Sequence, residues 1–219
     1  MQPEHRVHIL TIAGTLVIMY FLATKVVPNA GWLDTWQGGV AAYVATFGAY
    51  KTLHWLLALA INNWRLLRRL FFRSYYVEGT WVGYYYGERG EVRYVVDVIE
   101  QRIGRPLHIE GHGYRQDGRV YAEWSSVTAS VYAEGHQLIF VFDAHILSTG
   151  AKVDGITKFK LSRPKWFAPT WITGHATNTA SGKRFELNEE KMSNGVVEPT
   201  EAYRKAREFH ERTKAAIKS

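Results

Sequence analysis

The sequence predicts two transmembrane helices, then an all-β domain folded as an eight-stranded antiparallel up-and-down barrel, and finally a short C-terminal helix. Two apolar runs near the N-terminus are each long enough for a bilayer-spanning helix of about 20 residues. From Val77 onward the hydrophobic pattern changes from a helical period to alternation, with turn residues between the alternating segments. We therefore expect a membrane region over residues 1–73, a barrel over 74–198 and a helix over 199–219.

The membrane region holds two candidate spans joined by a short loop. The first, Val7 to Val27, is largely apolar, with His8 near its start and Lys25 near its end. A cleaved signal peptide is the alternative, but the cleavage pattern is poor and a second apolar run follows directly. That second span, Gly38 to Ile61, has tryptophans near both ends, which is typical of membrane interfaces. The intervening Pro28–Gly31 breaks the helix.

A basic segment joins the membrane region to the rest of the chain. Four arginines follow the second span, namely Arg65, Arg68, Arg69 and Arg73. Because Lys and Arg are enriched on the cytoplasmic side, this end and hence both termini are expected inside the cell, at the inner membrane. Four apolar residues recur there at helical spacing, namely Leu66, Leu67, Leu70 and Phe71. We expect an interfacial helix over residues 62–73, either a simple stop-transfer flank or an element that also relays a signal.

The second span carries two features that indicate contacts with other helices. A stripe of small residues lets helix backbones approach closely, and it consists of Ala41, Ala45 and Ala49 with Gly48 adjacent. It fits packing against the first span and self-association of copies equally well. Lys51 lies near the middle of the span, where burial of a charge costs about 2.5–3.5 kcal/mol. It indicates an oligomer interface or a pore, with membrane thinning or a register shift as the alternative.

Eight alternating segments make up the barrel. They are Tyr76–Tyr86, Glu91–Gln101, Pro106–Tyr114, Arg119–Val131, Gln137–Leu147, Val153–Leu161, Thr170–Thr179 and Lys183–Glu189. Four of the connections supply residues that tolerate positive φ, namely Gly87–Gly90, Gln116–Gly118, Ala133–Gly135 and Ala180–Gly182. Consecutive strands with tight turns favour a closed barrel, which has no exposed edges and holds one small ligand. Pro199 to Lys218 predicts a mostly solvated helix.

Known catalytic motifs are missing from the sequence. There is no hydrolase elbow, phosphate-binding glycine loop or zinc-binding His-Glu-x-x-His helix, and without cysteine there is no disulfide or thiolate metal site. In His108–His112 the two histidines stand about 13 Å apart on a strand, too far for one ion. At best one of them pairs with Glu110. We therefore expect no catalytic residues, no metal and no enzyme activity.

Two stretches of the barrel carry a resemblance to known families. Gly79-Thr80-Trp81-Val82-Gly83-Tyr84-Tyr85 is similar to the Gly-x-Trp opening of lipocalin-like barrels, where the Trp plugs the barrel base. Two short-looped spans followed by such a barrel, with a later Trp124-Ser125-Ser126, resemble the two-transmembrane, β-strand-rich effectors of bacterial cyclic-oligonucleotide antiphage systems (CBASS). The likeness covers about residues 7 to 190. It implies a cytoplasmic barrel that binds a cyclic dinucleotide, and spans that oligomerise and disrupt the inner membrane in abortive infection.

A cyclic dinucleotide needs cations or amide donors for its phosphates and flat rings for its bases. Strand alternation and residue type give the ligand-binding candidates Trp81, Tyr85, Tyr94, Trp124, Ser126, Thr128, Thr157 and Arg184. Each aromatic residue has barrel core as its alternative role, and each arginine has the surface. Four further arginines are equally available by type, namely Arg93, Arg102, Arg105 and Arg119. No other cofactor is expected.

Composition leaves the choice of ligand open. The 27 basic and 20 acidic residues give a formal charge of +7, but several of these charges flank the spans, so the charge is a weak argument for a DNA or RNA partner. The 8 Trp and 13 Tyr suit membrane interfaces, barrel interiors and base-stacking sites alike. Two alternatives therefore stand beside the cyclic-dinucleotide effector: a membrane-tethered barrel that carries a fatty acid or other lipid, and a scaffold with a filled barrel.

Overall fold

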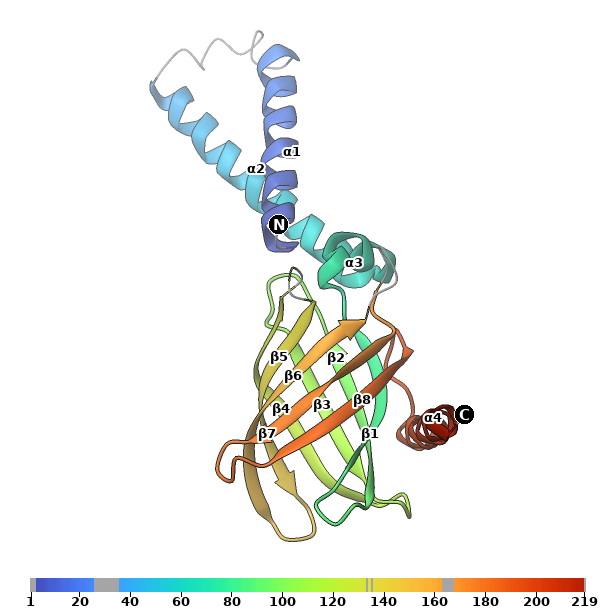
Figure 1. The fold of residues 1–219 in the computed structure, drawn as a ribbon. Helices are drawn as coiled ribbons and strands as arrows, with labels where there is room; N and C mark the ends of the chain where they lie inside the picture. The colour runs from blue at the N-terminus through green and yellow to red at the C-terminus, as the bar shows by residue number, and fades with distance from the viewer. Residues whose placement is uncertain (1–2, 26–35, 133, 135, 163–167, 219) are drawn as a thin grey trace. The chain divides into compact units, whose positions relative to one another are not determined.

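A computed structural model describes residues 3–25, 36–132, 134, 136–162 and 168–218 of the chain. The chain divides into two compact units, Met1–Phe72 and Arg73–Ser219. The first is helical and the second is the barrel with its terminal helix (Figure 1). The predicted loop Pro28–Gly31 and most of the predicted turn Ala133–Gly135 lie outside the described residues.

Both predicted spans are helices, α1 (Pro3–Lys25) and α2 (Trp36–Asn63). Within them, Pro3–Leu22 and Gly38–Asn63 are long and apolar enough to cross a bilayer. Large apolar side chains cover the outside of both helices; Val17, for example, is 68% exposed. An exposed apolar surface of this kind suits contact with lipid and not with water.

One face of α2 packs against α1. A Cβ added to Gly14 of α1 would lie 2.6 Å from Cδ2 of Leu53, so the helices touch closely there. The imidazole rings of His8 and His54 stack with centroids 4.8 Å apart. The small-residue stripe lies elsewhere on α2, because Ala41, Ala45 and Gly48 are exposed and Ala49 is half-buried. The contact between α1 and α2 therefore uses residues outside the stripe. Self-association of copies through the stripe stays a prediction.

The basic segment forms a helix shorter than predicted. Residues 62 and 63 still belong to α2, and α3 spans Arg65–Phe72, followed by the 3-10 helix η3 (Arg73–Tyr75). Leu66 and Leu70 of α3 are exposed. Arg68 is buried, and its guanidinium donates to the carbonyl of Asn62. The exposed leucines are the face that an interfacial helix would place in the membrane surface.

The predicted eight-stranded closed barrel is confirmed. Its strands are β1 (Gly79–Tyr86), β2 (Val92–Glu100), β3 (His108–Tyr114), β4 (Val120–Tyr132), β5 (Gln137–Ile146), β6 (Ala151–Ser162), β7 (Trp171–Asn178) and β8 (Arg184–Ser193). Each strand pairs antiparallel with the next, and β8 pairs with β1. Gly90, Gly118 and Gly182 have positive φ in three of the predicted turns, because a short hairpin loop needs a left-handed residue there.

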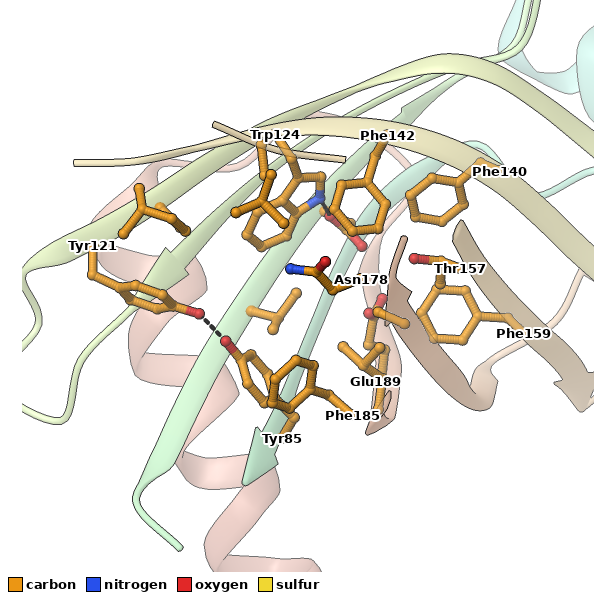
Figure 2. Close-up of a pocket in the computed structure, with 18 residues that line it drawn as sticks. Tyr85, Tyr121, Trp124, Phe140, Phe142, Thr157, Phe159, Asn178, Phe185 and Glu189 are labelled. Carbon is orange, nitrogen blue, oxygen red and sulfur yellow. Dashed lines mark hydrogen bonds between the residues drawn. The ribbon is translucent and has the colours of Figure 1, made fainter. Parts of the chain in front are cut away.

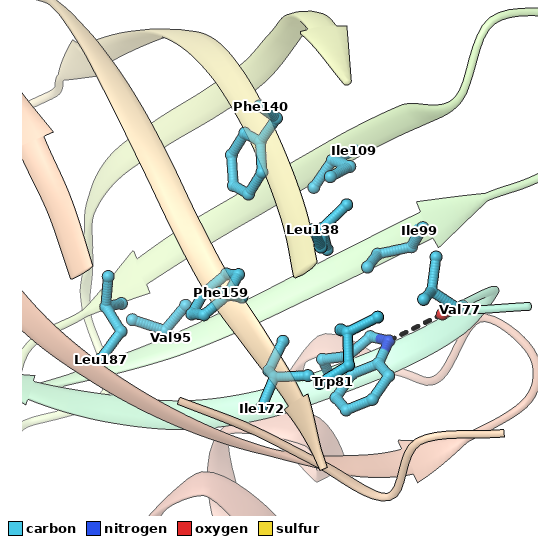
Figure 3. Packing of buried hydrophobic residues seen from close by; sticks show 11 residues of the cluster. Val77, Trp81, Val95, Ile99, Ile109, Leu138, Phe140, Phe159, Ile172 and Leu187 are labelled. Carbon is cyan, nitrogen blue, oxygen red and sulfur yellow. Dashed lines mark hydrogen bonds between the residues drawn. The ribbon is translucent and has the colours of Figure 1, made fainter. Parts of the chain in front are cut away.

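One end of the barrel is filled by apolar side chains. Trp81, which is fully buried, lies in a cluster with residues from the starts of β3, β5 and β7, such as Ile109, Leu138 and Ile172 (Figure 3). Its Nε1 donates a 2.9 Å hydrogen bond to the carbonyl of Val77. Trp81 therefore closes this end, as the lipocalin-like opening of the first strand implies, and we call it the closed end.

The C-terminal helix α4 (Pro199–Lys218) packs against the outer face of β1 and β2 (Figure 1). Ala202, Ala206 and Phe209 are buried against Tyr84 and Tyr94. The helix is mostly exposed, as predicted, and its apolar stripe covers part of the barrel wall. This contact also shows that Tyr94, a ligand candidate predicted from strand alternation, faces α4 and not the barrel interior. Val95, Asp97 and Ile99 point inward instead.

Candidate ligand pocket

The barrel contains a cavity of about 140 Å³, and its lining side chains are shown in Figure 2. The lining residues come from the middle of β2, the ends of β1, β5 and β7, the first half of β4 and the first and middle parts of β6 and β8. Most of them are aromatic or aliphatic, including Trp124, Phe140, Phe142, Phe159 and Phe185. Among the described residues that line the cavity there is no Lys, Arg or His. A flat apolar group fits such walls.

Glycines on the neighbouring strands make room for these large side chains. A Cβ added to Gly155 would lie 2.3 Å from Cζ of Phe142, and one added to Gly111 would lie 2.1 Å from Nε1 of Trp124. No real side chain tolerates such distances. Each glycine is therefore needed on its strand because a larger neighbour from the next strand occupies the space above it.

Two carboxyl groups form the floor of the cavity, Asp97 on β2 and Glu189 on β8. They are 3% and 0% exposed. Nε1 of Trp124 donates a 2.8 Å hydrogen bond to Oδ1 of Asp97, across Gly111, which pairs with both residues. Neither carboxyl oxygen of Glu189 has a hydrogen-bond partner among the described residues. The floor therefore holds one fixed carboxyl and one that is free to bind a ligand.

Burial sets the protonation of this pair. It raises the pKa of Asp97 to about 7, although the hydrogen bond from Trp124 and the neighbouring Glu189 carboxyl act in the opposite direction. Burial also raises the pKa of Glu189 well above its usual range, and the negative charge of Asp97 raises it further. Two adjacent carboxyl groups in an apolar site cannot both ionise cheaply. At neutral pH the pair therefore keeps at least one proton, on Glu189, which can then donate as well as accept.

Two tyrosines and an arginine lie at the other end of the cavity, which we call the mouth. The hydroxyl groups of Tyr85 and Tyr121 are hydrogen-bonded to each other (Figure 2). The guanidinium of Arg93 lies 4.8 Å from the ring centroid of Tyr121, and Arg93 also forms a 2.9 Å ion pair with Glu91. Burial raises the pKa of both tyrosines, so their hydroxyl groups stay protonated. The mouth thus combines one cation with two neutral hydroxyl groups.

Three of the sequence-predicted ligand residues line the cavity: Tyr85, Trp124 and Thr157. Two others serve the barrel itself. Trp81 belongs to the packed closed end, and the Oγ of Ser126 accepts a 2.9 Å hydrogen bond from the amide of Ile109.

The remaining three candidates lie outside the barrel interior and do not line the cavity. Tyr94 packs edge-to-face on Tyr203 of α4, with ring centroids 5.5 Å apart. Thr128 is exposed because the register between β4 and β5 shifts between Ser126 and Thr128, which turns the following side chains over. Arg184 is exposed and forms a 2.9 Å ion pair with Glu186 on the outer face.

Sequence reasoning missed most of the other lining residues, among them Asp97, Glu189, Tyr121 and Phe185. A signal existed for Asp97, since it is a lone acidic residue in the apolar run Tyr94–Ile99. Arg93 was considered only by its residue type. On the outer face, Nε2 of His108 lies 3.0 Å from Oε1 of Glu110, which confirms that one histidine of that run pairs with the glutamate.

The chain was compared with protein-family models, curated proteins and solved structures. No protein-family model matches the chain. No curated protein matches it either. Solved structures that resemble it include the redesigned beta barrel b11L5F_LGL, at 16% identity and a TM-score of 0.40, over 53% of this chain and 91% of that one. The redesigned beta barrel mFAP1, bound to DFHBI, has 19% identity and a TM-score of 0.40, over 52% of this chain and 94% of that one.

Proposed function

We propose that this protein is a membrane-anchored sensor of the antiphage effector type. Its barrel binds a cyclic dinucleotide, and the bound state favours association of the membrane helices, which then disrupt the inner membrane. The observation that carries the proposal is the composition of the pocket: aromatic walls, a hydrogen-bonding floor and the cation Arg93 at the mouth. Aromatic walls can stack on a base, the floor can hydrogen-bond to its edge, and Arg93 can pair with a phosphate. The protein acts as a receptor and performs no catalytic step.

The size of the cavity supports a specific way of binding. An apolar cavity of about 150 Å³ holds one benzene molecule, and the cavity here has about 140 Å³. A whole cyclic dinucleotide is much larger. In our proposal one base therefore enters the barrel, while the sugar-phosphate ring and the second base stay at the mouth. Arg93 lies where a phosphate of that ring would pass, and the Tyr85 and Tyr121 hydroxyl groups can donate to it.

The helical unit supplies a surface for the response. Ala41, Ala45 and Gly48 are exposed on α2 and are not used by the contact with α1. Small residues on a lipid-facing surface allow close approach of a second helix. Lys51 is also exposed, with its Nζ 4.7 Å from the ring centroid of Phe47. We propose that copies pack through the stripe and that Lys51 then faces the interface or a pore, because a charge in a bilayer favours a protein or water neighbour. Both termini face the cytoplasm in this proposal.

A lipid carrier is the second candidate function, because the cavity walls are predominantly apolar. A fatty acid would place its carboxylate at Arg93 and its tail in the cavity. The tail would then end against Asp97 and Glu189 without any hydrogen bond. Burying a polar group without a partner costs about 1–3 kcal/mol. The floor therefore favours a ligand with polar atoms at its inner end over a fatty acid.

Thermal unfolding of the detergent-solubilised full chain tests the proposal. The barrel should be stabilised by cyclic dinucleotides and not by palmitate, because a ligand at a hundred times its Kd adds about 2.7 kcal/mol. Stabilisation by palmitate alone would establish the lipid carrier. No stabilisation by either ligand would contradict both functions and favour a scaffold.

A further inference from the structure

The floor of the cavity has an unmet hydrogen-bonding requirement. Glu189 is fully buried, lines the cavity, and has no partner for either carboxyl oxygen among the described residues. Buried polar groups in folded proteins nearly always have a partner, so an orphaned one that points into a cavity indicates a missing ligand atom. Asp97 is less available to a ligand atom than Glu189, because the Nε1 of Trp124 already donates to its Oδ1.

We infer that the cavity is a subsite for one pyrimidine base, whose donor–acceptor edge pairs with Glu189 at the floor. This inference deepens the proposed function and rests on it for the nature of the whole ligand. The subsite itself is defined by the cavity alone.

The chemistry of the floor fits this edge. A carboxylic acid presents one O–H donor and one carbonyl acceptor side by side. Uracil presents the complementary pair, with N3–H next to a carbonyl, and cytosine presents N3 next to its amino group. The other described groups around the carboxyl leave this pairing undisturbed. Gly83 and Gly111 have no side chain, and Lys191 lies over the rings of Tyr76 and Trp81 on the closed side.

The size of the cavity selects the ring. Since an apolar cavity of about 150 Å³ accepts benzene, 140 Å³ accepts one six-membered ring. The fused rings of a purine require more room. Phe142 and Phe159 come from neighbouring strands and stand in the cavity wall, where they can contact a flat ring (Figure 2). The walls thus suit the single ring of a pyrimidine better than the fused rings of a purine.

Binding measurements on the full chain in detergent test the subsite with defined probes: uridine, 3-methyluridine, adenosine, 3′,3′-cyclic di-UMP and 3′,3′-cyclic di-AMP. Uridine should bind at least tenfold more tightly than 3-methyluridine, in which the N3 donor is blocked, and than adenosine. Glu189→Met, which keeps the volume but removes both polar atoms, should weaken uridine binding at least tenfold. Glu189→Gln should keep most of it, because an amide also presents one donor and one acceptor. Glu186→Met, an exposed outward-facing position on the same strand, is the matched control.

The outcomes separate the subsite from the proposed function. Equal binding of uridine and 3-methyluridine, or preference for the purine probes, would overturn the pyrimidine subsite, even if cyclic di-AMP binds and the proposed function stands. Binding of uridine without either cyclic dinucleotide would keep the subsite and overturn the proposed function. Binding of no probe would overturn both. The comparison of uridine with 3-methyluridine needs no variant, so it holds even if Glu189→Met fails to fold.

Discussion

Nε1 of Trp124 and Oδ1 of Asp97 are joined by a 2.8 Å hydrogen bond that passes over Gly111, the residue paired with each of them in the neighbouring strands. The bond fixes the tryptophan ring in the cavity wall and orients the carboxyl at the floor. It exists only because Gly111 has no Cβ, which would otherwise lie 2.1 Å from both atoms. Three strands thus cooperate to place one aromatic ring and one acid.

Trp124→Phe should remove this bond while keeping an aromatic ring. Leaving the buried Asp97 without its donor costs about 1–3 kcal/mol, so the barrel should lose that much stability in denaturant unfolding. Trp171→Phe is the matched control, because the buried Nε1 of Trp171 has no hydrogen-bond partner among the described residues. Both variants replace an indole by a smaller phenyl ring, so they should lose a similar amount of packing. Equal destabilisation by the two would show that the bond to Asp97 contributes nothing.

The carboxyl pair should make the barrel less stable as the pH rises. The pKa of Asp97 is near 3.8 in the unfolded chain and about 7 in the folded barrel. Between these values the folded state holds more protons than the unfolded state, so the unfolding free energy falls with rising pH. The loss from Asp97 is on the order of 4 kcal/mol and is complete a little above pH 7. Glu189 extends the fall to higher pH, since its pKa is raised further.

Denaturant titrations from pH 4 to 8 measure this dependence. Asp97→Asn should flatten the fall, because the amide still accepts from Trp124 but cannot ionise. Asp143→Asn removes an exposed carboxyl on the outer face and should leave the slope as in the wild type. A wild-type barrel whose stability rises over this range would show that the pair is not buried as described.

Arg93→Gln should weaken cyclic-dinucleotide binding at least tenfold, because hydrogen bonds to charged groups contribute about 1.5–3 kcal/mol. Folding should change little, since Arg93 and Glu91 form a partly exposed pair and such pairs contribute about 0–1 kcal/mol. Arg184→Gln is the control, because Arg184 lies on the outer face. Calorimetric titration of both variants with the same dinucleotide decides the matter. Equal losses of affinity in the two variants would contradict a specific role of Arg93 in binding the dinucleotide.

Much of the architecture was predictable because its signals are local. The two spans follow from apolar length, the strands from alternation, and the turns from glycines such as Gly90 and Gly118 that must adopt positive φ. The inward face of the first strand was also predictable, since Trp81 and Tyr85 share a face and both point inward.

The site was less predictable because it depends on pairing between strands. Both faces of β2 are apolar, one toward the barrel interior and one toward α4, so alternation alone could not tell Tyr94 from Val95. The register shift near Thr128 leaves no mark in the sequence. Glu189 has polar neighbours along the chain, so the sequence predicts an exposed side chain at this position. Only the closure of β8 on β1 brings it beside Gly83 and into the interior.

Ala45→Leu should block ligand-dependent assembly of the membrane helices. Ala45 is exposed on α2, and a leucine there would hold a second helix away from a surface on which backbones must touch. Crosslinking in cells should then show fewer oligomers on ligand production, with unchanged ligand affinity. Gly14→Leu is the contrasting variant, since it should disturb the contact with Leu53 inside one chain. Ligand-dependent oligomers at wild-type levels in Ala45→Leu would contradict self-association through the stripe.

The central claim is that a ligand in the barrel controls the membrane helices, and dye release from vesicles tests it most directly. The full chain would be reconstituted into dye-loaded vesicles, and 3′,3′-cyclic di-UMP or 3′,3′-cyclic di-AMP added from outside. Our account predicts rapid release with a dinucleotide that binds, little release without it, and little release from vesicles carrying Arg93→Gln. An intact dye load at a dinucleotide concentration that saturates the barrel would contradict it.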